Sequence, residues 1–168
     1  MKTGIMLAFA FGAACLASQA TASPEGNAKS EIQALEDHFA AAVTAKDLDA
    51  IMKVYARGQD LFVFDVVPPR DYAGWDAYRK DWKAFLDGIK GPIKFTLNDL
   101  VVHTDGTLGY SHSIQHMTGT DTKGKPYDLT VRVTDAYRKI DGKWRIVQEH
   151  VSVPVDLDTG KPDLTSAP

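Results

Sequence analysis

The sequence predicts an α+β fold, in which helices from the N-terminal half cover one face of a curved antiparallel sheet. Three observations support this. Helical periodicity dominates up to Gly88, apolar and polar residues alternate after Pro92, and the alternating segments are separated by turn-forming Asp-Gly or Lys-Gly pairs. Long antiparallel strands curl through twist and bulges, so a sheet closed by helices is expected to enclose a pocket.

The first 22 residues have the pattern of a secretory signal peptide. Lys2 gives a basic start, residues 5–16 are almost wholly apolar, and Ala20-Thr21-Ala22 matches a small-x-small cleavage site. We therefore predict a periplasmic or secreted protein. Removing 22 of the 168 residues leaves 146, enough for one domain.

The exported chain would contain no cysteine, because Cys15 lies inside the signal. The alternative is lipidation of Cys15, but Gly12-Ala13-Ala14 lacks the large apolar residue usual three positions before such a site. Loss of Lys2 leaves 18 of the 19 basic residues against 22 acidic ones, so the charge changes from −3 to −4. This acidic balance excludes the usual surface for nucleic acid or, after signal cleavage, for a membrane.

Three helices are expected in the first half of the mature chain. Ser30 can cap the first, with Gln33 reaching back to it, and Asp47 can cap a second, shorter one. The third ends at Gly88. It carries an aromatic face of Trp75, Tyr78, Trp82 and Phe85.

Four strands follow, at residues 93–103, 108–118, 127–139 and 143–153. Asp141-Gly142, between the last two, is a strong hairpin signal because both central residues of that turn need a positive φ. Hairpin linkage makes all four strands antiparallel neighbours in chain order. The domain is placed at residues 30–155, between a flexible N-terminus at 23–29 and a flexible tail at 156–168.

Several segments together resemble a known family. These are FVFDVVPPRDYAGWDAYRKDW, GYSHSIQHMTGT and RKIDGKWRIVQEHVSVP. In this order they are similar to the SnoaL-like, ketosteroid-isomerase-homologue branch of the nuclear transport factor 2-like superfamily, over residues 30–155. The last segment also resembles the association domain of calcium/calmodulin-dependent kinase II.

The resemblance implies a cone-shaped α+β barrel, usually dimeric, with a pocket between sheet and helices. Its members include isomerases, cyclases, dehydratases, epoxide hydrolases and proteins without a known reaction. Membership alone therefore does not decide the chemistry.

Asp65 is the first candidate catalytic residue. It lies in an apolar run, residues 61–67, which ends at Pro68-Pro69. Partial desolvation there would raise its pKa, as a general base near neutral pH requires. The alternative is that Asp65 caps the Pro-Pro turn at the exposed end of the strand.

Ketosteroid isomerase combines an Asp base with a Tyr and a protonated Asp. The sequence shows no clear equivalent of that Tyr and protonated Asp. Tyr55, Tyr72 or His112 could supply hydrogen-bond donors instead, so we include them among the candidate ligand-binding residues.

His112 and His116 lie on a predicted strand, where residues four apart share a face and stand about 13 Å apart. One metal ion cannot bridge them. Their face also carries Tyr110 and Ile114, and we expect it to be the concave side, with His112 in the pocket as a catalytic or ligand-binding residue. The alternative is a core histidine satisfied by the neighbouring strands.

Arg132 and His150 are further candidate ligand-binding residues, as are Trp75 and Trp82 of the third helix. Arg132 lies between Val131 and Val133, and a guanidinium inside a cavity needs a carboxylate partner or an anionic ligand. One bulge would reverse the assignment of faces on these strands. His150, on the face opposite Glu149, therefore points either into the pocket or into a dimer contact.

The aromatic residues of the third helix, Trp75, Trp82 and Phe85 among them, form either core or the walls of a ligand pocket. The mature sequence contains no nucleophile elbow, no phosphate-binding glycine loop and no Cys/His ligand cluster. We therefore expect no cofactor and no metal.

Two functions remain. We favour an exported domain that binds a small apolar or anionic molecule in an enclosed pocket without turnover; the alternative is a cofactor-independent isomerase, dehydratase or hydrolase with Asp65 as general base. The position of Asp65 discriminates between these functions. An Asp65 side chain that faces an apolar cavity beside a hydrogen-bond donor favours catalysis, and one that faces solvent favours binding. The sheet face that the helices leave uncovered is predicted to form a homodimer.

Overall fold

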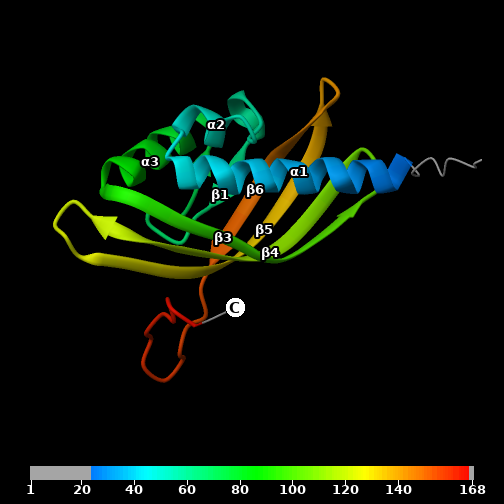
Figure 1. The fold of residues 1–168 in the computed structure, drawn as a ribbon. Helices are drawn as coiled ribbons and strands as arrows, with labels where there is room; N and C mark the ends of the chain where they lie inside the picture. Colours follow the sequence, from blue (N-terminus) through cyan, green and yellow to red (C-terminus); the bar gives the residue numbers. More distant parts are fainter. Residues whose placement is uncertain (1–23, 167–168) are drawn as a thin grey trace, which may run out of the picture.

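The computed structural model describes residues 24–166, so the predicted signal peptide lies outside the described residues. Helices precede the long strands, as predicted (Figure 1). The helices are α1 (Pro24–Ala45), α2 (Leu48–Met52) and α3 (Trp75–Asp87). None of these described helices is long and apolar enough to cross a membrane.

The strands form one curved sheet in the order β2-β1-β6-β5-β4-β3 (Figure 1). The four long strands are antiparallel neighbours in chain order, which confirms the predicted meander. The short β1 adds to β6 in parallel, a pairing that the sequence did not indicate. The strands are β1 (Phe62–Phe64), β2 (Tyr72–Ala73), β3 (Ile89–Thr104), β4 (Leu108–Asp121), β5 (Pro126–Ile140) and β6 (Lys143–Ser152).

The β5–β6 hairpin turns as its sequence predicts. Asp141 and Gly142 have φ values of 49° and 73°. Both values lie in the left-handed region that this two-residue turn requires. The turn fixes the register from which the rest of the hairpin is built.

Two of the three predicted helix ends agree with the structure. Asp47 caps α2, with its carboxylate accepting a hydrogen bond from Ala50 N at 3.0 Å, and α3 ends at Gly88. The predicted cap at Ser30 is wrong. α1 already begins at Pro24, and the Ser30 hydroxyl donates to the carbonyl of Gly26 inside the helix.

All three helices cover one face of the sheet, which we call the inner face (Figure 1). Ile32 of α1 lies against Gly109 of β4. A Cβ atom there would lie 2.9 Å from Ile32 Cδ1 and 3.0 Å from His103 O. The absence of a side chain at Gly109 therefore lets α1 pack on the sheet.

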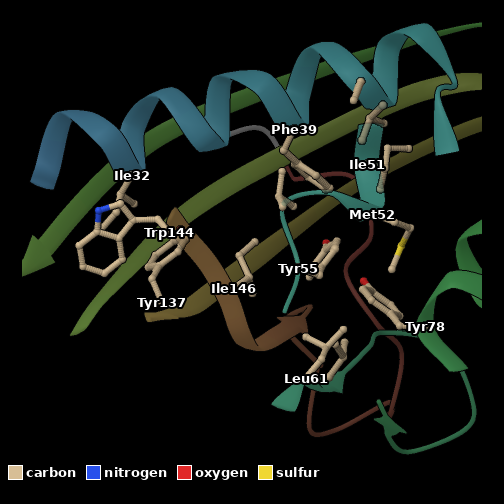
Figure 2. Close-up of a cluster of buried hydrophobic side chains, with 14 of the residues drawn as sticks. Ile32, Phe39, Ile51, Met52, Tyr55, Leu61, Tyr78, Tyr137, Trp144 and Ile146 are labelled. Atoms are coloured by element: carbon tan, nitrogen blue, oxygen red, sulfur yellow. The ribbon is translucent and has the colours of Figure 1, made fainter. Parts of the chain in front are cut away.

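The core fills the space between α1 and the inner face. Figure 2 shows Phe39 of α1, Tyr55 and Tyr78 converging with Ile146 of β6. All four side chains are buried. Two of them, Phe39 and Tyr78, also line the pocket described below.

The described part of the C-terminal segment folds back on the sheet. Thr130 N of β5 donates to Leu164 O at 2.7 Å, and Asp163 N donates to Pro154 O at 2.9 Å. These bonds occupy part of the β5 edge that lies beyond the end of β6, although we had expected residues 156–168 to be flexible.

Candidate functional site

A pocket of about 270 Å³ lies between the helices and the inner face of the sheet. Its walls are mostly aromatic and aliphatic, with Phe39 from α1, Trp82 and Phe85 from α3 and Phe95 from β3. A pocket of this composition suits a compact apolar ligand. Its polar groups are few, and they include Asp65, Asp81, Gln115 and Glu149.

A β-bulge decides which residues of β6 face this pocket. The register of β5 and β6 shifts between Ala136 and Tyr137, which leaves Val147 of β6 as an extra residue. A bulge of this kind reverses the alternation of faces. Trp144, which precedes the bulge, and Glu149, which follows it, are both buried. On a regular strand these two residues, five positions apart, would point to opposite faces.

Glu149 is held in the pocket wall by two tyrosines. Tyr55 OH donates to its Oε2 at 2.9 Å, and Tyr78 OH donates to its Oε1 at 2.5 Å. The two rings pack edge to face, with centroids 5.2 Å apart (Figure 2). Burial raises the pKa of Glu149; the Tyr78 hydrogen bond opposes this, and the charge of Asp65 adds to it.

Asp65 lies just beyond the end of β1 and is half-buried against the same pocket. Its Oδ1 accepts a hydrogen bond from Val66 N at 2.5 Å. Burial raises the pKa of Asp65, the Val66 amide lowers it, and the neighbouring Asp81 raises it further. Asp65 thus lines an apolar cavity, and it also caps the turn that follows it.

Neutral groups that could donate hydrogen bonds line the pocket with these acids. They include the Gln115 amide of β4 and the Tyr127 hydroxyl of β5. Burial, followed by the charge of Asp65, raises the pKa of Tyr127 to about 12, so this hydroxyl keeps its proton at neutral pH. An acid with a raised pKa thus shares an apolar cavity with a protonated donor.

The scan against family models matches the SnoaL-like domain over residues 32–156. The chain belongs to the SnoaL-like domain family. No functionally curated protein matches it. An NTF2-like protein of unknown function from Pseudomonas putida is 30% identical, with a TM-score of 0.75, over 84% of this chain and 97% of the other.

Two further solved structures show the same architecture. One, from Xanthomonas campestris, is described as a calcium/calmodulin-dependent protein kinase II association domain. It is 28% identical, with a TM-score of 0.62, over 73% of this chain and 84% of that one. A protein assigned as a scytalone dehydratase, from Novosphingobium aromaticivorans, is 14% identical with a TM-score of 0.67, over 81% and 90%. At that identity the second likeness shows the fold alone.

Within this SnoaL-like domain, Asp65 and Trp82 line the pocket. Tyr55 lies behind the wall, where it supports Glu149. Tyr72 likewise acts through another residue, because its hydroxyl donates to Asp81 Oδ1 at 2.6 Å. Burial above all raises the pKa of Tyr72, and Asp81 adds to this effect.

Trp75 is not among the residues that line the pocket. Its Nε1 donates to Met52 O at 2.9 Å, and the Arg57 guanidinium lies 3.8 Å from the centroid of its ring. Trp75 therefore joins α3 to α2. Its predicted place in the pocket is wrong.

The predicted places of His112 and Arg132 in the pocket are also wrong, and the pocket alternative for His150 is wrong as well. All three side chains are exposed on the opposite, outer face of the sheet. On β4 and β5 the inner face is the one that carries Ser111, Ser113 and Gln115, or Val131, Val133 and Asp135. On β6 the bulge turns Glu149 inward and His150 outward, where the His150 ring packs against Phe64 at 5.5 Å.

Sequence reasoning missed Tyr127 and underrated Glu149. Tyr127 alternates with Leu129 and Val131, and all three line the pocket. Following this alternation back from the buried Val131 would have found Tyr127. No local signal marks Glu149, because its orientation depends on the bulge.

The charges of the SnoaL-like pocket are all of one sign. Its described lining contains Asp65, Asp81 and Glu149 but no Lys, Arg or His. In the part of the chain that the structure describes, no group of three or more His, Cys, Asp or Glu side chains could hold a metal ion. The arrangement is suited to accepting and donating protons, and it would repel an anion.

Proposed function

We propose that the pocket performs cofactor-independent proton transfer on a small, neutral, largely apolar molecule, as an isomerase or dehydratase does. One observation carries this proposal. Asp65, whose pKa is raised by burial, faces an apolar cavity that also holds the protonated Tyr127 hydroxyl. An acid so placed can remove a proton, while the hydroxyl stabilises the negative charge that develops.

The other polar groups take complementary roles in this proposal. Glu149, whose pKa is raised toward neutrality, returns a proton to a second position of the same molecule. Tyr78 keeps the Glu149 carboxyl oriented. The Gln115 amide assists Tyr127 at the developing oxyanion.

Binding without turnover is the second candidate, and one observation favours it. Both oxygens of Glu149 already accept hydrogen bonds from tyrosines, so this carboxyl group is partly satisfied without a ligand. The pocket would then hold a neutral apolar molecule with one donor group directed at Asp65. The anionic ligand expected from the sequence is disfavoured, because no basic side chain lines the described pocket.

A generic probe tests the base without knowledge of the natural substrate. 5-Nitrobenzisoxazole is neutral and compact; when a base removes its ring C–H proton, the N–O bond breaks and a coloured cyanophenolate forms. We expect the protein to accelerate this reaction over buffer, and Asp65→Asn to lower kcat by roughly 100-fold, as for loss of a general base. Asp60→Asn, an exposed acid outside the pocket, is the matched control and should keep the wild-type rate.

Equal rates for Asp65→Asn and Asp60→Asn would end the catalytic proposal. Quenching of the tryptophan fluorescence by the probe that is lost in Trp82→Phe, with no turnover, would leave the binding alternative. A comparison of 2-naphthol with 2-naphthoate then tests ligand charge. We expect the neutral naphthol to bind at least 10-fold more tightly, because the carboxylate would meet three acids.

We also propose export to the periplasm or the cell exterior. The basic start, apolar run and Ala-x-Ala site of the sequence support it. Mass spectrometry of the protein from its native cell should find an N-terminus at or near Ser23. An intact Met1 in a cytoplasmic fraction would contradict this proposal.

A further inference from the structure

A second buried acid, Asp135, lies beside Glu149. The register of β5 and β6 pairs the two residues directly, and their side chains are 1% and 4% exposed. Like charges directly opposite each other on a sheet repel, and the protein interior solvates neither. The pair therefore avoids holding two negative charges.

No cation compensates the pair among the described residues that interact with it. The groups that face it from the packed elements are carboxyls and hydroxyls only. They come from α1, the segment after α2, α3, the end of β1, and strands β4 and β5. They are Glu36, Tyr55, Tyr78, Asp65, Ser111 and Tyr137.

The hydrogen bonds indicate which acid of the pair keeps a proton. Glu149 accepts bonds from two tyrosine hydroxyls, which stabilise its ionised form. Asp135 Oδ1 is buried and has no partner among the described residues. An ionised carboxylate with such an oxygen is costly, so the proton stays on Asp135. Burial first, then the charges of Glu36 and Glu149, raise the pKa of Asp135 well above its usual range.

We propose that Asp135 is a positioning residue, which stays neutral and donates a hydrogen bond to the Glu149 carboxylate. It does not line the pocket, so it acts only through Glu149. The inference rests on the proposed function, because it assigns Asp135 the task of holding Glu149 in place while that group gives and regains a proton. Its test needs no substrate.

Infrared titration of the whole protein counts protonated carboxyl groups by their C=O stretch. We expect wild-type protein to keep one such band at pH 8.5, where Glu149 is mostly ionised. Asp135→Asn, which is isosteric, should lose this band. Asp128→Asn is the matched control, since Asp128 is an exposed acid on the same strand, and it should keep the band.

The titration of Glu149 itself, assigned by its loss in Glu149→Gln, gives a second measurement. Asp135→Asn should move its midpoint by less than about half a pH unit, because the amide still donates. Asp135→Ala should raise it by at least about one unit, because a donor to the ionised form is lost. If Asp135 had a purely structural role, neither substitution would change the titration midpoint of Glu149.

An ionised Asp135 would overturn the proposal. No band would then persist at pH 8.5, and Asp135→Asn would lower the Glu149 midpoint by more than one unit, because a like charge is removed. The wild-type band and the isosteric variant decide the question even if Asp135→Ala does not fold. Failure of the proposed reaction is separate: it would appear as no turnover of 5-nitrobenzisoxazole with the infrared results unchanged.

Discussion

The two faces of the sheet differ in which of the candidate polar residues they carry. The inner face buries Asp135 and Glu149, whereas the outer face exposes Arg132, His112 and His150. Each residue of the first set is next to, or three positions from, a residue of the second in the chain. Residue type therefore did not tell us which face a polar side chain would occupy.

A physical asymmetry explains the division. A carboxyl group can enter an apolar interior by taking up a proton, which removes the charge. The Arg132 guanidinium cannot lose its charge in a protein, so on the inner face it would need a buried partner. Glu149 of the inner face and Glu36 of α1 accept their hydrogen bonds from tyrosine hydroxyls instead.

The strongest test of the two faces introduces the same charge on each. Val133→Asp places an extra acid among the buried groups of the inner face. We expect it to lower the free energy of unfolding by roughly 3–5 kcal/mol. Arg138→Asp, at an exposed site on the same strand, should change it by less than about 1 kcal/mol. Urea unfolding measures both, and similar losses would mean that the faces are wrongly assigned.

The fold of these strands was predictable, but the orientation of β6 was not. The alternation after Pro92 and the Asp141-Gly142 turn predicted the meander, because both are local signals. The bulge at Val147 has no such signal, and one extra residue is enough to exchange Glu149 and His150 between faces.

The candidate site was predictable in part. Asp65, a carboxylate within the apolar run 61–67, does line the pocket, although it lies just beyond the end of β1 rather than inside a strand. The hydrogen bond from Tyr78 to Glu149 joins residues 71 positions apart. Contacts of this length follow from packing, which no local pattern encodes. The same is true of α1, which starts at Pro24 although Ser30 is a good cap.

The pH dependence of stability is the second test, because it depends on the buried acids. Burial raises the pKa of Glu36 and of Glu149 from 4.5 to about 7. Between these values the folded state binds more protons than the unfolded state, so their contribution is full below pH 4.5 and is lost as the pH rises through 7. The loss is on the order of 3 kcal/mol for each group.

Urea unfolding at pH 5 and pH 8 measures this loss. Glu36→Gln is the matched variant, because its amide does not titrate; it should reduce the difference between the two pH values without removing it, since Glu149 and Asp135 still take up protons on folding. Stability that increases from pH 5 to pH 8 would contradict the burial of these two acids.

A smaller effect is expected where α1 touches the inner face. Gly109→Ala puts a Cβ atom 2.9 Å from Ile32 Cδ1, and such overpacking costs roughly 1–3 kcal/mol. Gly119→Ala is the control on the same strand, where the nearest atom is 3.5 Å away and the contact is ordinary. Thermal unfolding should separate the two variants, and equal melting temperatures would place α1 farther from β4.

The smallest effect on the fold is expected on the outer face, where we predict the homodimer contact. A continuous row crosses five strands there: Phe64, His150, Thr134, His112 and Val101 are successive Cα partners. Phe64 and Val101 are large apolar side chains left exposed at its two ends, and exposed apolar groups of this kind mark interfaces.

Thr134→Lys places a cation at the centre of this row. It should convert a dimer into a monomer at micromolar concentration, because an unpaired charge in a dry contact is costly. Thr134→Val keeps the shape of the side chain and should leave the dimer intact. Light scattering distinguishes these outcomes, and circular dichroism should show that both variants remain folded, because the side chain points away from the core. A monomer mass for the wild-type protein would show that the outer face forms no dimer contact. The two faces would then differ only in their exposure to water.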